Sequence, residues 1–147
     1  SGVVVLGSDD RNTRSLVDVW TSEGKRLALV QEYMPAVRVG DKRVLMLDGK
    51  PLGAILRVPR ADDVRANIHA GGTVQQTDLT EREQELVTEV GAGLREHGLW
   101  FVGLDLIGER LIEVNVTSPT GIQELARHQG RPTEQDVIAW VERQVSP

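Results

Sequence analysis

Hydrophobic and polar positions alternate along the chain with two different periods. A period of two, typical of strands, runs through residues 102–106 and 112–116, and the mainly apolar stretches 42–47 and 52–58 flank Asp48-Gly49, which indicates a tight hairpin turn. Apolar residues then recur at helical spacing from a capping box at Thr80–Glu83 to Gly98. The same criteria predict strands at 3–6, 27–33, 100–107 and 111–116, and helices capped by Ser8–Asp10, around Ile122 and Leu125, and capped by Thr133 with Asp136.

The order of these elements indicates an α+β fold with a mainly antiparallel sheet and helices packed on one face. Residues 59–78 contain almost no large apolar side chains, which predicts a long loop between the first hairpin and the Thr80 helix. With 147 residues the chain is long enough for one domain, at about 150 residues per domain.

Charge and composition narrow the classes of function. The chain has 17 Lys and Arg against 22 Asp and Glu, a net charge of −5, so it lacks the basic excess of a nucleic-acid-binding protein. It has no membrane-length apolar run, which argues against a membrane partner. It also has no cysteine, which excludes disulfides and thiolate chemistry and fits a cytoplasmic location.

The second predicted hairpin carries the most informative polar residues. If Leu104 lies opposite Val114 and Leu106 opposite Ile112, residues 108–110 form a three-residue loop. Asp105 then faces Glu113, and Asn115 lies two residues further along the same face. Opposed acids destabilise a sheet, so a compensating charge is expected. A divalent cation, Mg²⁺ best, fits three hard oxygen ligands, whereas a solvated face with an arginine partner is the alternative.

Arginines on the first hairpin and in the loop after it are candidate anion ligands, because guanidinium groups match phosphate and carboxylate oxygens. Arg57 interrupts an apolar run, although it also fits an outward-facing position on an alternating strand. The candidates are Arg43, Arg57 and Arg65, and a solvated loop charge is the alternative for Arg65.

Several segments together resemble the bacterial type of glutathione synthetase, a family with the ATP-grasp fold. They are Gln31–Pro35, Gly40–Leu45, Arg65-x-Asn67 before Ala70–Gly72, Val102–Asp105 and Glu113–Gly121. The resemblance implies an ATP-dependent ligase that joins γ-glutamylcysteine and glycine through an acyl phosphate. ATP, γ-glutamylcysteine and glycine are then the expected partners, and a homo-oligomer is left open.

The resemblance also implies roles for individual residues. Gln31, Glu32, Tyr33 and Met34 would line the adenine, Asp41 would lie near the ribose, and Asn115 would contact both ATP and metal. Arg43 and Arg57 would face the γ-phosphate and the activated carboxylate. Asp105, Glu113 and Asn115 would hold Mg²⁺, or alternatively Mn²⁺. Arg65, Asn67, Ser118, Thr120 and Gly121 would bind the substrate carboxylates.

The family's chain is longer than this one, which suggests that residues 1–147 are a fragment of the ATP-grasp domain. We expect the amino-terminal substrate domain and most of the first ATP-grasp subdomain to be absent, and this chain alone to be inactive. Two other functions remain open. One is an ATP-grasp ligase for other amino acids or peptides, and the other is a non-catalytic nucleotide-binding or oligomerisation module.

Overall fold

The computed structural model describes residues 4–59 and 72–146, which form two units, Ser1–Pro35 and Ala36–Pro147. In the first unit the helix α1 (Thr13–Thr21) is confirmed, but residues 4–6 and 27–33 do not form the expected strands. Leu27, Leu29 and Val30 are almost fully exposed. A β-branched or apolar run forms a strand only beside a pairing partner, and no strand is described in this unit.

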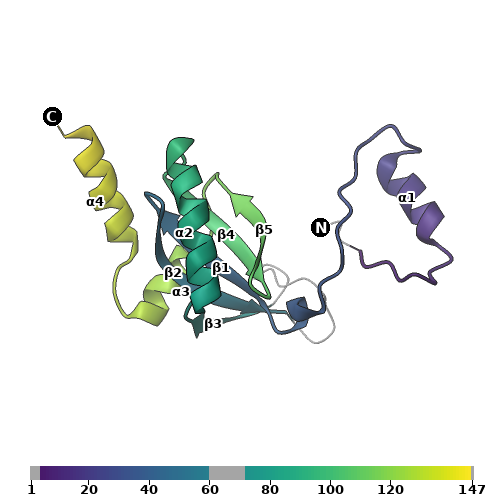
Figure 1. The fold of residues 1–147 in the computed structure, drawn as a ribbon, viewed down its shortest axis with the longest axis horizontal. Helices are drawn as coiled ribbons and strands as arrows, with labels where there is room; N and C mark the ends of the chain where they lie inside the picture. Colours follow the sequence, from purple (N-terminus) through teal and green to yellow (C-terminus); the bar gives the residue numbers. More distant parts are fainter. Residues whose placement is uncertain (1–3, 60–71, 147) are drawn as a thin grey trace. The chain divides into compact units, whose positions relative to one another are not determined.

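The second unit is built on a five-stranded antiparallel sheet with the order β3-β2-β1-β4-β5 (Figure 1). This confirms the expected α+β class. Its elements follow η1 (Pro35–Arg38), a short 3₁₀ helix. They are β1 (Asp41–Leu47), β2 (Lys50–Val58), β3 (Thr73–Thr77), α2 (Glu81–Glu96), β4 (Phe101–Ile107), β5 (Arg110–Asn115), α3 (Ile122–Gln129) and α4 (Glu134–Val145).

Both predicted hairpins form. Asp48 and Gly49 connect β1 to β2 with positive φ angles of 50° and 73°, as a tight hairpin turn requires. The predicted loop at 59–78 is wrong in part, because β3 lies within it and pairs with β2 at the sheet edge. Its sequence, TVQQT, holds one large apolar residue, so its apolar signal is weak. Residues 60–71 lie outside the described part of the chain.

The two faces of the sheet carry different helices. Val44 and Met46 pack with Val87 and Leu94 of α2, whereas Leu45 packs on the opposite face. The second cluster joins Leu45 and Ile55 to Leu125 of α3. Helices therefore cover both faces and not one, as Figure 1 shows for α2 and α3. The face that bears α3 also carries the polar residues of the site.

The β4–β5 hairpin differs from the expected register at its tip. Leu104 lies opposite Val114 and Asp105 opposite Glu113, as predicted. Leu106, however, pairs with Leu111 and not with Ile112, because the register shifts between Asp105 and Leu106. Ile107 then pairs with Arg110, which leaves a two-residue turn in place of the expected three-residue loop.

The helix ends follow the sequence signals unevenly. The capping box of α2 is confirmed, with Thr80 and Glu83 bonded to each other's backbone nitrogens. Thr133 does not cap α4 through its side chain. Its hydroxyl donates to Gln129 Oε1 at 2.7 Å, so this buried residue joins α4 to the end of α3. None of the helices within residues 4–59 and 72–146 combines the length and the hydropathy of a membrane-spanning segment.

Candidate active site

Four charged side chains meet on the sheet face that bears α3. Asp41 and Arg43 lie two residues apart on β1 and therefore point to the same side. Arg57 lies opposite Asp41 on β2, and Asp105 lies opposite Arg43 on β4. Three neighbouring strands thus bring two arginines and two aspartates together, and we call these four residues the charge network.

Arg43 and Asp105 form a buried bidentate pair. Arg43 Nε donates to Asp105 Oδ1 at 2.5 Å, and Arg43 Nη2 donates to Oδ2 at 3.0 Å. The third guanidinium nitrogen, Nη1, donates to the backbone oxygen of Thr120 at 3.0 Å. Arg43 is 5% exposed, so this geometry is held within the protein and not by solvent. The arginine therefore connects β1, β4 and the turn before α3.

Arg57 extends from β2 across β1 and bridges the two aspartates. Its Nε donates to Asp41 Oδ1, and its Nη2 lies 3.0 Å from Asp105 Oδ2. Arg57 is 6% exposed, so its interpretation as an outward-facing surface residue is wrong. The sequence left two interpretations of the hairpin face that carries Asp105, a metal site or a solvated face with an arginine partner. The contacts of Asp105 itself match the arginine partner. Asp105 therefore forms ion pairs with two arginines, Arg43 and Arg57.

Burial and ion pairing act against each other on the pKa values of this network. Burial raises the pKa of Asp41 above its ordinary value, and the hydrogen bond and charge of Arg57 offset this only in part. Burial lowers the pKa of Arg57, but the hydrogen bond that Arg57 donates to Asp41 and the charges of Asp105 and Asp41 outweigh it and raise the pKa overall. Arg57 therefore remains a firmly charged group for an anionic ligand.

Glu113 and Asn115 complete the acidic hairpin beside this network. Glu113 is exposed and lies opposite Asp105, and Asn115 Nδ2 donates to Asp105 Oδ2 at 3.4 Å. The three predicted metal ligands thus share one face. Within the described ranges, no cluster of three or more acidic or histidine side chains gathers for a metal. Two carboxylates and an amide still fit Mg²⁺, which typically takes one or two carboxylates with water and phosphate.

The turn before α3 lies next to Arg43. Thr120 supplies the carbonyl that Arg43 binds, and Gly121, the N-cap of α3, has φ +114°, a conformation that favours glycine. Gly103, on β4, leaves room for this arrangement. A Cβ there would lie 2.9 Å from Pro119 Cβ and 3.2 Å from Arg43 Cδ. Absence of a side chain at this position therefore lets Arg43 cross β4.

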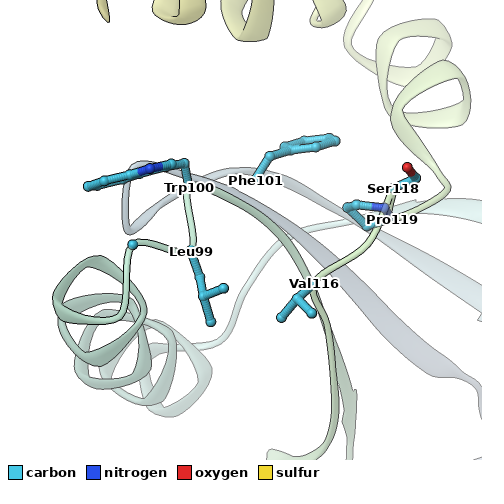
Figure 2. A pocket seen from close by; sticks show the side chains of 7 residues that line it. Leu99, Trp100, Phe101, Val116, Ser118 and Pro119 are labelled. Carbon is cyan, nitrogen blue, oxygen red and sulfur yellow. The ribbon is translucent and has the colours of Figure 1, made fainter.

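A shallow pocket of about 510 Å³ lies beside the same turn (Figure 2). Its lining is mainly apolar, with Leu99 just before β4, Val116 just after β5, and Ser118 and Pro119 from the turn. Trp100 also lines the pocket, and its ring centroid lies 5.5 Å from that of Trp140 of α4. The lining includes Ser118, but none of the charge network.

Other predicted residues lie in the first unit or outside the described residues. Gln31, Glu32, Tyr33 and Met34 belong to the first unit, Ser1–Pro35. Arg65 and Asn67 lie outside the described residues. Sequence reasoning missed that Asp41 binds Arg57 and that Thr120 acts through its backbone oxygen. The alternation of side chains along the two strands could have found the first only if the bulge in β2 had been known.

The fold and the charge network define an α+β domain with buried arginines suited to an anionic ligand. Comparison with known proteins gives its family. The model of the family "Prokaryotic glutathione synthetase, ATP-grasp domain" matches residues 1–130, and the chain belongs to this family.

Three relatives, each named glutathione synthetase, illustrate the similarity. The protein of Nostoc sp. is 46% identical over 142 residues, which cover 97% of this chain and 44% of the relative. That of Agrobacterium fabrum is 49% identical over 130 residues, 88% of this chain and 41% of the relative. That of Gloeobacter violaceus is 45% identical over 146 residues, 99% of this chain and 45% of the relative. The chain thus spans less than half the length of these relatives.

Proposed function

We propose that this chain contributes the anion- and metal-binding part of an ATP-dependent ligase that joins γ-glutamylcysteine to glycine. In this reaction ATP phosphorylates the carboxylate of γ-glutamylcysteine, which releases ADP. The glycine amine then attacks the acyl phosphate and phosphate leaves. Membership of the glutathione synthetase family supports the proposal, together with two buried arginines on the sheet face beside the Thr117–Gly121 turn.

The arginines carry the electrostatic part of the proposal. Arg43 and Arg57 would bind the γ-phosphate and the carboxylate that becomes phosphorylated, because buried guanidinium donors stabilise developing negative charge without reorganising. Their positions across three strands are held by Asp41, Asp105 and the Thr120 carbonyl. This pre-organisation is the observation on which the function chiefly rests.

The acidic hairpin would hold the cation. Asp105, Glu113 and Asn115 offer hard oxygens on one face, and Mg²⁺ bound there would neutralise charge that develops during phosphoryl transfer. Asp105 would then be shared between a cation and two arginines, and Glu113, which is exposed, would provide the second carboxylate.

The remaining contacts follow from the family resemblance. Residues 31–34 would line the adenine and Asp41 would lie near the ribose. The substrate carboxylates would be bound by Arg65, Asn67, Ser118, Thr120 and Gly121. A cytoplasmic location for the reaction is part of this proposal, and the absence of cysteine is compatible with it.

Two experiments test the proposal. In calorimetry, Mg-ATP should bind the purified chain, and Arg43→Gln should weaken binding about tenfold or more, whereas Arg82→Gln on the exposed face of α2 should not. In the second, the chain replaces the matching segment of the Nostoc relative. This chimera should release phosphate only when ATP, γ-glutamylcysteine and glycine are all present. A folded chimera that uses a different acceptor, or none, would contradict the proposed substrates.

A further inference from the structure

Arg57 is held by two carboxylates at two different nitrogens. Asp41 on the neighbouring strand accepts from Nε, and Asp105 on the third strand lies 3.0 Å from Nη2. Because the guanidinium group is planar, fixing Nε together with one terminal nitrogen fixes the plane of the whole group. The direction of the remaining donors is therefore set by this pair of aspartates.

Asp41 and Asp105 differ in the other residues that they contact. Asp105 also binds Arg43 through both oxygens and accepts from Asn115. Within residues 4–59 and 72–146, the carboxylate of Asp41 binds Arg57 and no other side chain. A ligand that binds Asp105 weakens the ion pair between Asp105 and Arg57, whereas the contact between Asp41 and Arg57 stays in place.

We propose that Asp41 is a positioning residue that orients the Arg57 guanidinium toward the anionic ligand. The inference rests on the proposed function, in which Arg57 faces the γ-phosphate and the activated carboxylate. It gives Asp41 a role beyond proximity to the ribose, since one of its oxygens is occupied by Arg57.

Stability alone is a poor reason for such a pair. Both partners are largely buried, with side-chain exposures of 7% for Arg57 and 15% for Asp41. Removing two charges from water costs free energy that their attraction only partly offsets, and apolar pairs of similar volume are often as stable. A buried pair beside an anion site is better explained by the orientation it gives to the arginine.

The first test observes the Arg57 side chain directly by ¹⁵N NMR of arginine Nε–H groups in this chain. Asp41→Asn should shift the Arg57 Nε–H resonance and make its exchange with water about tenfold faster. The Arg43 resonance should move much less, because its Nε is bound by Asp105. Asp48→Asn, in the turn of the same hairpin, provides the matched control, since Asp48 pairs with the exposed Arg95.

The second test separates positioning from a structural role through a double-mutant cycle with Mg-ATP as the probe. Asp41→Asn and Arg57→Gln should each weaken binding about tenfold, and the double variant should lose clearly less than the sum of the two single losses. A merely structural Asp41 would weaken binding by its full amount in the Arg57→Gln background as well. If Asp41→Asn does not fold, Asp41→Glu, which keeps the charge but displaces the carboxylate, enters the same cycle.

The outcomes are distinct. An unchanged Arg57 resonance in Asp41→Asn, or additive losses in the cycle, would overturn the positioning role. Failure of the wild-type chain to bind Mg-ATP would count against the proposed function, while the Arg57 resonance would still decide whether Asp41 orients the arginine.

Discussion

Asp105 and Glu113 lie directly opposite each other on β4 and β5, although both are acidic. Like charges in such a pair destabilise a sheet. The structure tolerates the pair because Asp105 is compensated by Arg43 and Arg57, and because Glu113 lies at the exposed edge strand. The hairpin thus carries one neutralised carboxylate and one that faces solvent.

Replacing Asp105 should be the most damaging change within the charge network. Asp105→Asn leaves two buried arginines without one of their carboxylates, so the free energy of unfolding should fall by about 3 kcal/mol. Urea denaturation of the chain measures this loss. Glu113→Gln, at the exposed partner position, is the control and should change it by less than about 0.5 kcal/mol. Equal effects of the two changes would contradict the assigned network.

The two glycines Gly103 and Gly93 should respond in opposite directions to alanine. Gly103→Ala places a Cβ 2.9 Å from Pro119 Cβ and close to Arg43, so it should destabilise the chain by about 1–3 kcal/mol. Gly93 lies within α2 with no atom within 4 Å of an added Cβ, so Gly93→Ala should stabilise it by about 0.5–1 kcal/mol. Thermal unfolding of both variants checks the pair. An unchanged stability of Gly103→Ala would mean that the turn that contains Pro119 shifts at little cost in free energy.

The raised pKa of Asp41 predicts a specific pH dependence. Burial, opposed in part by Arg57, holds the pKa of this carboxyl above its ordinary value of 3.8 in the folded chain. The folded state then binds the proton more tightly than the unfolded state, so the ionised carboxyl opposes folding at neutral pH. This penalty is relieved as the pH falls through the raised pKa toward 3.8.

Carbon NMR of the Asp41 carboxyl tests this directly, and its midpoint should lie above 3.8. The stability of Asp41→Asn, compared with that of the wild type across the same pH range, isolates the contribution of this group. A midpoint below 3.8 would show that Arg57 outweighs burial.

Cation binding should depend on the exposed member of the acidic pair. Glu113→Gln removes one of two carboxylates, so the affinity of the chain for Mn²⁺, used as a paramagnetic probe of the Mg²⁺ site, should fall about tenfold. Glu89→Gln, at an exposed position on α2, removes one negative charge as Glu113→Gln does, and it should leave the affinity for Mn²⁺ unaltered. Relaxation of water protons measures both. Equal losses would indicate only non-specific attraction to a negatively charged chain.

Local signals predicted most of the elements in the second unit, because their causes are local. The Asp48-Gly49 pair supplies the positive φ angles of its own turn, and the Thr80–Glu83 box caps its own helix. The strand expected at residues 27–33 failed for the opposite reason. The apolar residues of this segment are typical of a strand. A strand forms only when its backbone pairs with a neighbouring strand, and the propensity of the residues does not supply that neighbour.

The candidate site depended on two irregularities that no pattern revealed. Without the register shift in the first hairpin, counting back from the turn would place Arg57 on the face opposite Arg43. The shift between Leu45 and Met46 pairs Asp41 with Arg57 and brings both arginines to one face. A second shift near Asp105 keeps Glu113 opposite it despite the two-residue turn.

The sequence by itself determined which residue types were available for this chemistry: arginines on the first hairpin, and two acids with an amide on the second. Only the tertiary structure decided that Arg57 is buried and that it binds Asp41 and Asp105 together. The physical reason is that the alternation of side chains along one strand tells only which residues of that same strand share a face of the sheet. Pairing, bulges and the third strand β4 decide which side chains from separate strands meet.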